Sequence, residues 1–292
     1  MKKKVCILLS ILLLIVLAGC TKPAEEPVEE PTEITYVDGI AAPNTSDTKI
    51  SIGVTPIPHA EIVNDVVKAK LEKAGWTVEV VEFNDYVLPN TALQDGDLDA
   101  NYFQTIAYLD EQNEERGLTL RAIFGVHLEP MGCYSNTITS VDEITADVTI
   151  AIPNDGSNES RALKLLEDNG LIVLKETDGL YDLTSVDDEK SLVKSSQISE
   201  LDAASLPRVL EDVTLAVING NYALSSGLNP LTDALFAEKA DSEESYKYIN
   251  YIVVRADDED SVKSLALEAA FNNQDVVDYI NEKYSGTVIP AF

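Results

Sequence analysis

Short apolar runs alternate with segments whose apolar residues follow helical spacing, from Lys49 to the end of the chain. Residues 50–54, 77–83, 148–153 and 213–219 have the composition of buried strands, and helical patterns separate them. This alternation predicts an α/β fold in which parallel strands are joined by right-handed crossover helices. The 292-residue chain is long enough for two medium-sized lobes or one large domain.

The strands fall into an early and a late set, which could form one large sheet or two lobes with a cleft between them. A further buried strand pattern at 248–255 and two helical patterns follow the late set, so this end could return to the first lobe. Two extended segments, near 127–135 and 245–251, would then cross between the lobes. Ligands of α/β folds bind beyond the carboxyl ends of the strands. The candidate loops are those after Val54, Phe83, Ala100, Ile152 and Val217.

The first 20 residues have the layout of a bacterial lipoprotein signal. Three lysines precede an apolar run at 5–19, which at about 15 residues is shorter than a membrane-spanning helix. The run ends in Leu17-Ala18-Gly19-Cys20, which matches the lipobox, where the signal peptidase cuts before a cysteine that carries lipid. We predict a signal peptide at 1–19, lipid such as palmitate on Cys20, and anchoring at the extracytoplasmic face of the cell membrane. The alternative is a plain N-terminal membrane anchor.

Residues 20–48 are predicted to be a flexible tether that begins at the lipidated cysteine. Four prolines and five glutamates occur between residues 21 and 48, and large apolar residues are few. A segment of this composition cannot bury enough surface to fold by itself. The folded part is therefore expected to start at residue 49 and to stand away from the membrane.

The acidic composition excludes nucleic acid as a partner. The formal net charge is −30, and removal of residues 1–19 takes away three lysines and no acidic residue, which leaves −33. Such a surface repels phosphate backbones and anionic lipid headgroups. We therefore expect membrane attachment through the lipid at Cys20 and not through a basic patch.

Cysteine and histidine are too scarce for a disulfide framework or a zinc motif. Outside the leader and Cys20, one thiol remains, Cys133, and the chain holds two histidines. No nucleophile elbow and no phosphate-binding loop occur in the sequence. We predict a protein without catalytic activity, cofactor or metal ion. A thiol hydrolase that uses Cys133 with His127 is the enzymatic alternative, although a free cysteine is more often simply buried.

A strand end, a polar turn and a helix start come together just before Arg161, which lies in the first helical turn. Ser157 or Asn158 is the predicted N-cap. Unpaired backbone N–H groups at a helix start favour an anion, and a guanidinium can hold a carboxylate through two parallel hydrogen bonds. This arrangement is compatible with a carboxylate receptor. Taken alone, the stretch favours a surface ion pair between Arg161 and Glu159 or Asp155, because exposed ion pairs are common.

The other candidate loops carry aromatic and amide side chains. Amide groups offer both donors and acceptors, and aromatic rings can wall an apolar side chain. Together with an arginine for the carboxylate, this mixture suits an amino acid, although each aromatic residue taken alone is more often part of a core. The residues are Tyr86, Tyr102, Phe103, Asn158 and Asn219.

These residues belong to motifs whose order resembles that of the NlpA-type substrate-binding lipoproteins, which serve methionine ABC importers. The resemblance extends over about residues 50–292, and the lipobox is in place. The motifs are Thr55-Pro56-Ile57-Pro58-His59-Ala60-Glu61, Glu82-Phe83-Asn84-Asp85-Tyr86, Gly96-Asp97-Leu98-Asp99-Ala100-Asn101, His127-Leu128-Glu129-Pro130, Ile152-Pro153-Asn154-Asp155 with Asn158 and Arg161, and Ala216-Val217-Ile218-Asn219-Gly220-Asn221-Tyr222-Ala223.

The resemblance implies a two-lobed periplasmic-binding-protein fold, type II-like, with two crossover strands. Lobe 1 would comprise residues 49–129 and 248–292, and lobe 2 would comprise residues 130–247. The protein would close on L-methionine, or on a related small amino acid or methionyl peptide. It would then deliver this ligand to the permease and ATPase subunits of an ABC importer.

By the same resemblance, Arg161 would pair with the ligand carboxylate, and Asn158 and Asn219 would bind its polar end. The ligand side chain would lie in a pocket formed by the aromatic residues named above, Tyr86, Tyr102 and Phe103.

The sequence departs from the family pattern beside this pocket. The family usually has Gln-His-x-Pro-Tyr-Leu, whereas this chain has Gln104-Thr105-Ile106-Ala107-Tyr108-Leu109. Thr105 therefore stands in place of the histidine, and Ala107 in place of the proline. A shorter, uncharged hydroxyl at Thr105 is expected to change how the pocket treats the ligand.

A different binding function stays open from the residues alone. The chain could be a surface lipoprotein that recognises a macromolecule. That alternative predicts a shallow or filled cleft and no stabilisation by small molecules.

Overall fold

The computed structural model describes residues 33–239 and 243–292, and residues 34–292 form one compact unit. The predicted signal peptide and Cys20 lie outside the described residues. In the described part of the chain, no helix has the length and apolar character needed to cross a membrane.

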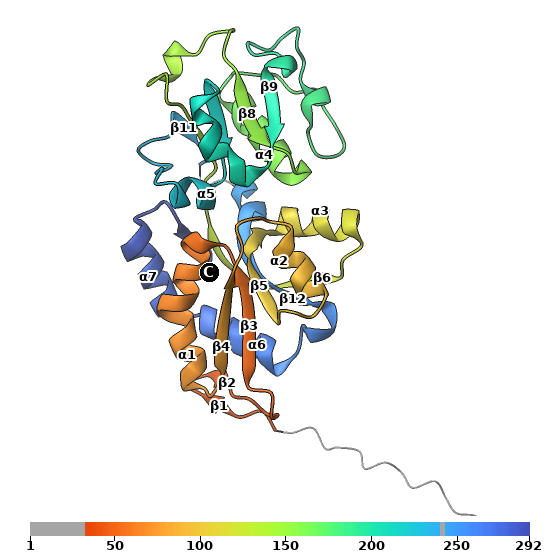
Figure 1. Ribbon diagram of the computed structural model, residues 1–292, viewed down its shortest axis with the longest axis vertical. Helices are drawn as coiled ribbons and strands as arrows, with labels where there is room; N and C mark the ends of the chain where they lie inside the picture. Colours follow the sequence, from red (N-terminus) through yellow and green to blue (C-terminus); the bar gives the residue numbers. More distant parts are fainter. Residues whose placement is uncertain (1–32, 240–242) are drawn as a thin grey trace, which may run out of the picture. The chain divides into compact units, whose positions relative to one another are not determined.

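Two sheets with their helices build two lobes, which confirms the predicted two-lobed α/β fold (Figure 1). The six-stranded sheet of lobe 1 has the order β13-β6-β12-β5-β3-β4, and the five-stranded sheet of lobe 2 has the order β11-β7-β10-β8-β9. The strands of lobe 1 are β3 (Lys49–Val54), β4 (Thr77–Glu82), β5 (Ala100–Thr105), β6 (Leu120–Leu128), β12 (Ile249–Arg255) and β13 (Ile289–Pro290). The strands of lobe 2 are β7 (Gly132–Tyr134), β8 (Ile150–Pro153), β9 (Ile198–Leu201), β10 (Leu215–Ile218) and β11 (Phe236–Ala237).

Both sheets are mixed, although the alternation of strands and helices led us to expect parallel ones. In lobe 1, β3 runs parallel to β4 and β5, but β12 is antiparallel to β5 and β6. In lobe 2, β8 is parallel to β9 and β10, but β7 is antiparallel to β10. The chain enters one lobe from the other through β7 and through β12. Each of them starts at the edge where the parallel strands end, and it therefore runs against them.

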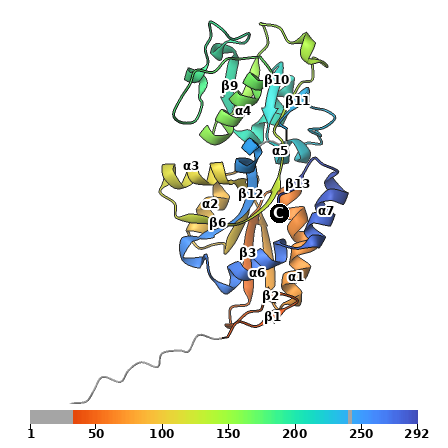
Figure 2. The same cartoon turned by 180° about the vertical axis from the view of Figure 1, so that it is seen from behind.

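Helices cover both faces of the lobe 1 sheet (Figures 1 and 2). Because side chains alternate along a strand, β12 contributes to two cores: Ile252 and Val254 to one, Val253 to the other. The first core lies under α1 (Lys68–Lys73), α6 (Val262–Phe271) and α7 (Gln274–Tyr284), and the second under α2 (Leu88–Gln94) and α3 (Ile106–Arg116).

Lobe 2 is built around α4 and the strands beside it. Its helices are α4 (Gly156–Asp168) and α5 (Gly220–Ser225), with the 3-10 segment η6 (Ala203–Glu211). Shorter helical segments of the whole chain are η1 (Pro56–Ala60), η2 (Val63–Val67), η3 (Val141–Glu143), η4 (Leu183–Ser185), η5 (Ser195–Gln197), η7 (Glu243–Tyr248) and η8 (Ala256–Asp258).

The chain crosses between the lobes twice, as expected. It leaves lobe 1 between β6 and β7, and it returns between β11 and β12 (Figure 2). The residue boundaries given above for the two lobes stay a prediction.

The expectation of an unstructured tether up to residue 48 is wrong for its last part. β1 (Tyr36–Val37) pairs antiparallel with β2 (Ile40–Ala41), and both residues of β2 are buried. The indole Nε1 of Trp76 donates a hydrogen bond of 2.8 Å to the carbonyl oxygen of Ala41. Composition averages over a whole segment, so it missed two apolar residues that pack onto lobe 1.

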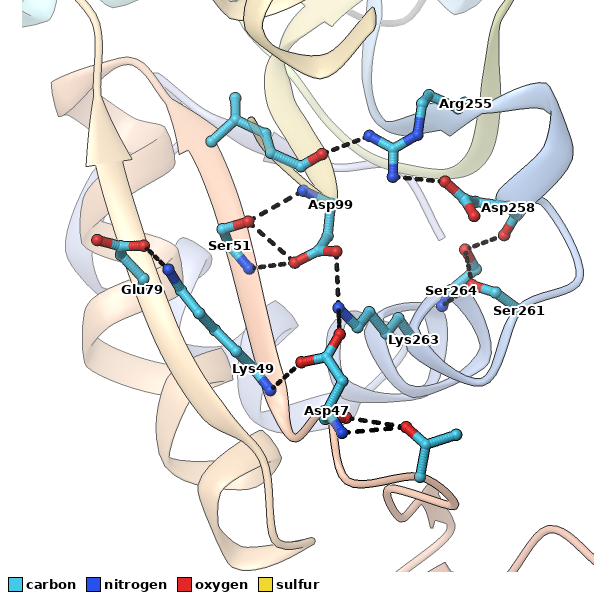
Figure 3. Close-up of polar contacts among 12 residues, drawn as sticks. Asp47, Lys49, Ser51, Glu79, Asp99, Arg255, Asp258, Ser261, Lys263 and Ser264 are labelled. Atoms are coloured by element: carbon cyan, nitrogen blue, oxygen red, sulfur yellow. Dashed lines mark hydrogen bonds and ion pairs between the residues drawn. The ribbon is translucent and has the colours of Figure 1, made fainter. Parts of the chain in front are cut away.

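Charged residues fasten the segment before β3 to lobe 1 (Figure 3). Lys263 of α6 lies between Asp47 and Asp99, and its Nζ is 2.7 Å from an oxygen of each carboxylate. Asp99 also accepts hydrogen bonds from the backbone N–H and the hydroxyl of Ser51 in β3, at 2.8 and 2.9 Å. One lysine thereby joins the helix, the sheet and the segment that leads into it.

Candidate functional site

A small cavity lies between the lobes, beside both crossovers. Its open volume is about 30 Å³, which is room for about two water molecules. A larger occupant therefore requires the lobes to separate first. The lining residues are Tyr86, Phe103, Gln104, Thr105, Tyr108 and Asn250 from lobe 1, Glu129 from the first crossover, and Asn158, Arg161, Asn219, Gly220 and Asn221 from lobe 2.

Six of the seven predicted binding residues line this cavity, and Tyr102 is the exception. Phe103 lines the cavity, whereas Tyr102 is fully buried in the core of lobe 1. The Tyr102 ring lies 5.0 Å from that of Phe271 between centroids, and its hydroxyl bonds to Nδ1 of His127. This corrects the predicted place of Tyr102: it lies behind the cavity and not in its wall.

The start of α4 places two of the lining side chains. Asp155 is its N-cap and accepts a hydrogen bond of 2.9 Å from the backbone N–H of Asn158, so the predicted caps, Ser157 and Asn158, are wrong. A carboxylate can reach the third backbone N–H after it, which explains the choice of cap. The same oxygen accepts from Asn158 Nδ2 at 2.8 Å. The cap therefore fixes the orientation of the Asn158 amide.

The oriented Asn158 amide in turn holds the side chain of Asn219, which follows β10. Asn219 Nδ2 donates a hydrogen bond of 2.7 Å to Asn158 Oδ1. Asn219 is buried, and its Oδ1 has no hydrogen-bond partner among the described residues. A buried carbonyl oxygen without a donor is rare in folded proteins. Asn219, which lines the cavity, thus holds one fixed, unpaired acceptor.

Arg161 is buried and held by a carboxylate, but not by either of the acids considered from the sequence. Its Nε and Nη2 donate to the two carboxylate oxygens of Glu238, at 2.7 and 2.6 Å. Nη2 also donates to the backbone carbonyl of Glu129 at 2.8 Å, and the guanidinium carbon lies 4.1 Å from the ring centre of Tyr248. The pair is forked and rigid. No hydrogen bond joins Nη1 to a described residue.

Aromatic rings from both lobes meet at the cavity. The Tyr86 ring lies 5.8 Å from that of Phe103 and 4.9 Å from that of Tyr222, between centroids. The Tyr86 hydroxyl donates to Asn221 Oδ1 at 2.5 Å, a bond between the lobes. Burial holds the pKa of this hydroxyl well above its usual range, so it remains a donor. The rings give the cavity one apolar side.

Thr105, where the sequence leaves the family pattern, serves two purposes. It lines the cavity, and it is the N-cap of α3, where its hydroxyl accepts from the backbone N–H of Tyr108 at 3.2 Å. The neighbouring Gln104 is fixed by buried amides: its Nε2 donates to Asn90 at 2.6 Å and to Asn101 at 2.9 Å. This side of the cavity is therefore rigid and polar.

Both histidines of the chain meet one carboxyl group, which the sequence did not single out. Nε2 of His127 lies 2.7 Å from Oε1 of Glu129, and Nε2 of His59 lies 3.5 Å from the same oxygen. All three side chains are buried. Burial raises the pKa of Glu129 to about 7 and lowers the pKa of His59 to about 4 and of His127 to about 3. Near neutral pH, both imidazoles are therefore uncharged.

Among the described residues, these three are the group close enough to share a metal ion, with ligand atoms within 4.8 Å of one another. Both ring nitrogens of each histidine and Oε1 of Glu129, however, already take part in hydrogen bonds. The sequence did hold a signal for them, since His59, His127 and Glu129 all lie in the family motifs. Glu238 lies in none, and only the fold brings it to Arg161.

Cys133 does not form the thiol–imidazole pair of the enzymatic alternative. It is fully buried in β7, and burial raises the pKa of its thiol well above the usual range. His127 bonds to Tyr102 and Glu129. A nucleophilic thiolate needs exposure and a lowered pKa, so this position favours a structural role.

Comparison with known proteins gives consistent matches over the folded part of the chain. The family model described as NlpA lipoprotein matches residues 50–292. The D-methionine-binding lipoprotein MetQ of Escherichia coli (strain K12) is 39% identical over 245 residues, which cover 83% of this chain and 88% of that protein. Membrane lipoprotein TpN32 of Treponema pallidum is 36% identical, with coverage of 86% and 92%.

Solved structures agree with the sequence matches. A nutrient binding protein from Burkholderia cenocepacia, bound to methionine, is 40% identical with a TM-score of 0.77, and the match covers 83% of this chain and all of that one. The methionine binding protein MetQ is 37% identical with a TM-score of 0.78, covering 85% and 99%. The similarity therefore extends to the fold, both lobes included.

Proposed function

The chain belongs to the NlpA lipoprotein family, and from this premise we propose that it is a lipid-anchored solute-binding protein for L-methionine or a related small amino acid or methionyl peptide. It delivers this ligand to the permease and ATPase subunits of an ABC importer. Relatives named for methionine binding and a similar structure bound to methionine support the choice of ligand.

One observation carries the proposal: the unpaired Oδ1 of Asn219 in the cavity wall. A ligand that brings an N–H donor satisfies this atom, and the ammonium group of an amino acid is such a donor. Asn158 holds the amide in place, so the acceptor is preorganised.

Arg161 supplies the counterpart for the ligand carboxylate. Two of its nitrogens are bound to Glu238, and Nη1 has no hydrogen bond to a described residue. Tyr86 and Phe103 form the apolar side against which the ligand side chain packs. The cavity thus offers one place for each part of an amino acid.

Lobe separation admits the ligand, and closure encloses it. The cavity has an open volume of about 30 Å³, and Tyr86 and Asn221 are bonded across it. Rotation about the two crossovers opens this space, as in other hinged binding proteins. The lipid on Cys20 keeps the protein beside the importer at the extracytoplasmic face of the membrane.

Thermal unfolding with added amino acids tests the proposal. The mature chain should gain melting temperature with L-methionine, since a ligand that binds only the folded state stabilises it by mass action. Native mass spectrometry of the protein as purified should show a retained ligand of matching mass. If none of the twenty amino acids or methionyl dipeptides gives a shift, the surface lipoprotein that binds a macromolecule becomes the better function.

A further inference from the structure

Glu129 lies at the point where the chain leaves lobe 1, and one of its oxygens is free for a ligand. Oε1 faces His127 and His59. No hydrogen bond joins Oε2 to a described residue, and the side chain lines the cavity. Oε2 points toward Gly220: a Cβ built at that glycine would be 2.9 Å from Oε2 and 2.7 Å from the Glu129 Cβ. Glycine at 220 therefore leaves the space into which the carboxyl group extends.

The imidazoles hold this carboxyl group without giving it a counter-charge. Asn250 Oδ1, which can only accept, lies 3.1 Å from Nε2 of His59, so this nitrogen carries the hydrogen. The Thr55 hydroxyl is then the donor to Nδ1 of His59 at 2.7 Å. His127 is bound in the same way, with the Tyr102 hydroxyl at Nδ1 and the carboxyl group at Nε2. The neutral His127 ring therefore donates to Oε1, whereas the Nε2–H of His59 bonds to Asn250 and lies 3.5 Å from that oxygen.

The other groups around Glu129 do not supply a free cation either. The guanidinium of Arg161 is neutralised by the carboxylate of Glu238, and it touches Glu129 only through the backbone carbonyl. Tyr86 and Tyr102 are uncharged because burial raises the pKa of both hydroxyls. The titratable and charged groups that face Glu129 are thus His59 from η1, His127 from β6, Tyr102 from β5, Tyr86 from the loop after β4, and Arg161 from α4 with Glu238 behind it.

We propose that Glu129 receives the ammonium group of the ligand and loses its own proton to solvent as the ligand binds. The inference rests on the proposed function and adds to it a required group on the ligand and a proton released on binding. The O–H bond at Oε2 breaks, a buffer base takes the proton, and the carboxylate that remains pairs with the ammonium nitrogen. No oxidation state changes.

The pKa of Glu129, raised to about 7 by burial, supports this step. A carboxyl group with such a pKa is about half protonated at pH 7. An ammonium group brought into contact favours the ionised form. Binding should therefore release about 0.5 proton per ligand at pH 7, and about 0.1 at pH 8.

The ligand must then carry a free ammonium group. An N-acylated amino acid has an amide in this place, which brings no charge and leaves Glu129 without its partner. The ammonium group can belong to a free amino acid or to the N-terminus of a methionyl peptide. L-Methionine, methionyl-glycine, glycyl-methionine and N-acetyl-L-methionine distinguish these sources.

Isothermal titration of the mature chain tests the proposal. L-Methionine is titrated at pH 6, 7 and 8 in pairs of buffers with different ionisation enthalpies, so that the slope gives the number of protons exchanged. We expect release that falls from pH 6 to pH 8, and affinity that rises over the same range. N-Acetyl-L-methionine should bind at least a hundredfold more weakly than L-methionine. The variant Glu129→Gln should release no proton and bind L-methionine at least tenfold more weakly.

Glu282→Gln, at an exposed position in α7, is the matched control and should behave like the wild type. Tight binding of L-methionine without proton exchange, or equal binding of the N-acetyl compound, overturns the inference and leaves the proposed function standing. Absence of any L-methionine binding to the wild type contradicts the proposed function itself. If Glu129→Gln does not fold, the comparison of N-acetyl-L-methionine with L-methionine on the wild type still tests the inference.

Discussion

Arg161 and Glu238 form a forked pair at the edge of the cavity, in which Nε bonds to Oε1 at 2.7 Å and Nη2 bonds to Oε2 at 2.6 Å. The two residues lie on α4 and directly after β11, 77 positions apart in sequence. A ligand carboxylate at Arg161 would therefore meet a guanidinium that already has an anion. Glu238 and the ligand compete for one positive charge.

We expect Glu238→Gln to tighten the binding of L-methionine. Removal of the competing charge is worth about 1 kcal/mol at a partly exposed position, or about a fivefold lower Kd. Arg161 keeps its orientation, because Glu129 and Tyr248 still hold the guanidinium. The Kd is measured by titration calorimetry, with the exposed Glu211→Gln as control. A weaker affinity would mean that Glu238 positions Arg161 and does not compete with the ligand.

The arrangement of Asn158 and Asn219 could be anticipated from the sequence, and the reason is the sheet. Each follows an apolar strand, and β8 and β10 are neighbouring parallel strands, so their carboxyl ends open at the same edge. The motif order pointed to the same residues. The apolar strand before each asparagine and the common edge at which parallel strands end both predicted that the two residues lie close together. The two amides are hydrogen-bonded in the structure.

Other parts of the site depend on tertiary contacts that no local pattern encodes. The sequence of β5 does not say that Phe103 lines the cavity while Tyr102 is buried in the core of lobe 1. The pairing of Arg161 with Glu238, and of Glu129 with His59, joins segments far apart in sequence. An acidic chain offers too many possible partners for such pairs to be chosen by sequence alone.

Asn219→Ala should weaken the binding of L-methionine about thirtyfold. The change removes the unpaired acceptor in the cavity wall, and a hydrogen bond to a charged group contributes about 2 kcal/mol. Kd is again the quantity to measure. Asn281→Ala, at an exposed position on α7, is the matched control and should leave Kd unchanged. An unchanged Kd for Asn219→Ala would remove the observation on which the proposed function rests.

Tyr86→Phe should favour the open arrangement of the lobes. The hydroxyl bond from Tyr86 to Asn221 exists only when the lobes are closed, and its loss costs about 1 kcal/mol. We expect a Kd for L-methionine about fivefold higher, and a larger radius of gyration without ligand by small-angle scattering. Tyr279→Phe removes a hydroxyl that bonds to Asp65 within lobe 1, so it should change neither quantity. Equal effects of the two variants would argue against a role of the Tyr86 hydroxyl in closure.

The carboxyl group of Glu129 should make the ligand-free protein less stable as pH rises, in comparison with Glu129→Gln. Its pKa is about 7 in the folded protein against 4.5 as its ordinary value, so between these pH values the unfolded chain has lost a proton that the folded protein retains. The free energy of unfolding of the wild type should therefore fall relative to the variant by about 3 kcal/mol between pH 4.5 and pH 7. Below pH 4.5 and above pH 7 the difference should be constant.

Urea unfolding of both proteins at a series of pH values measures this difference. The acidic groups that lie far from residue 129 titrate alike in both proteins, so the subtraction reports on residue 129 and on His59, whose pKa the Glu129 charge raises. The amide variant has the shape of the protonated carboxyl group, so the proteins should be closest in stability at low pH. A difference that does not change with pH would place the pKa of Glu129 near its ordinary value. In that case burial would not hold a proton on this group, and ligand binding would have none to release.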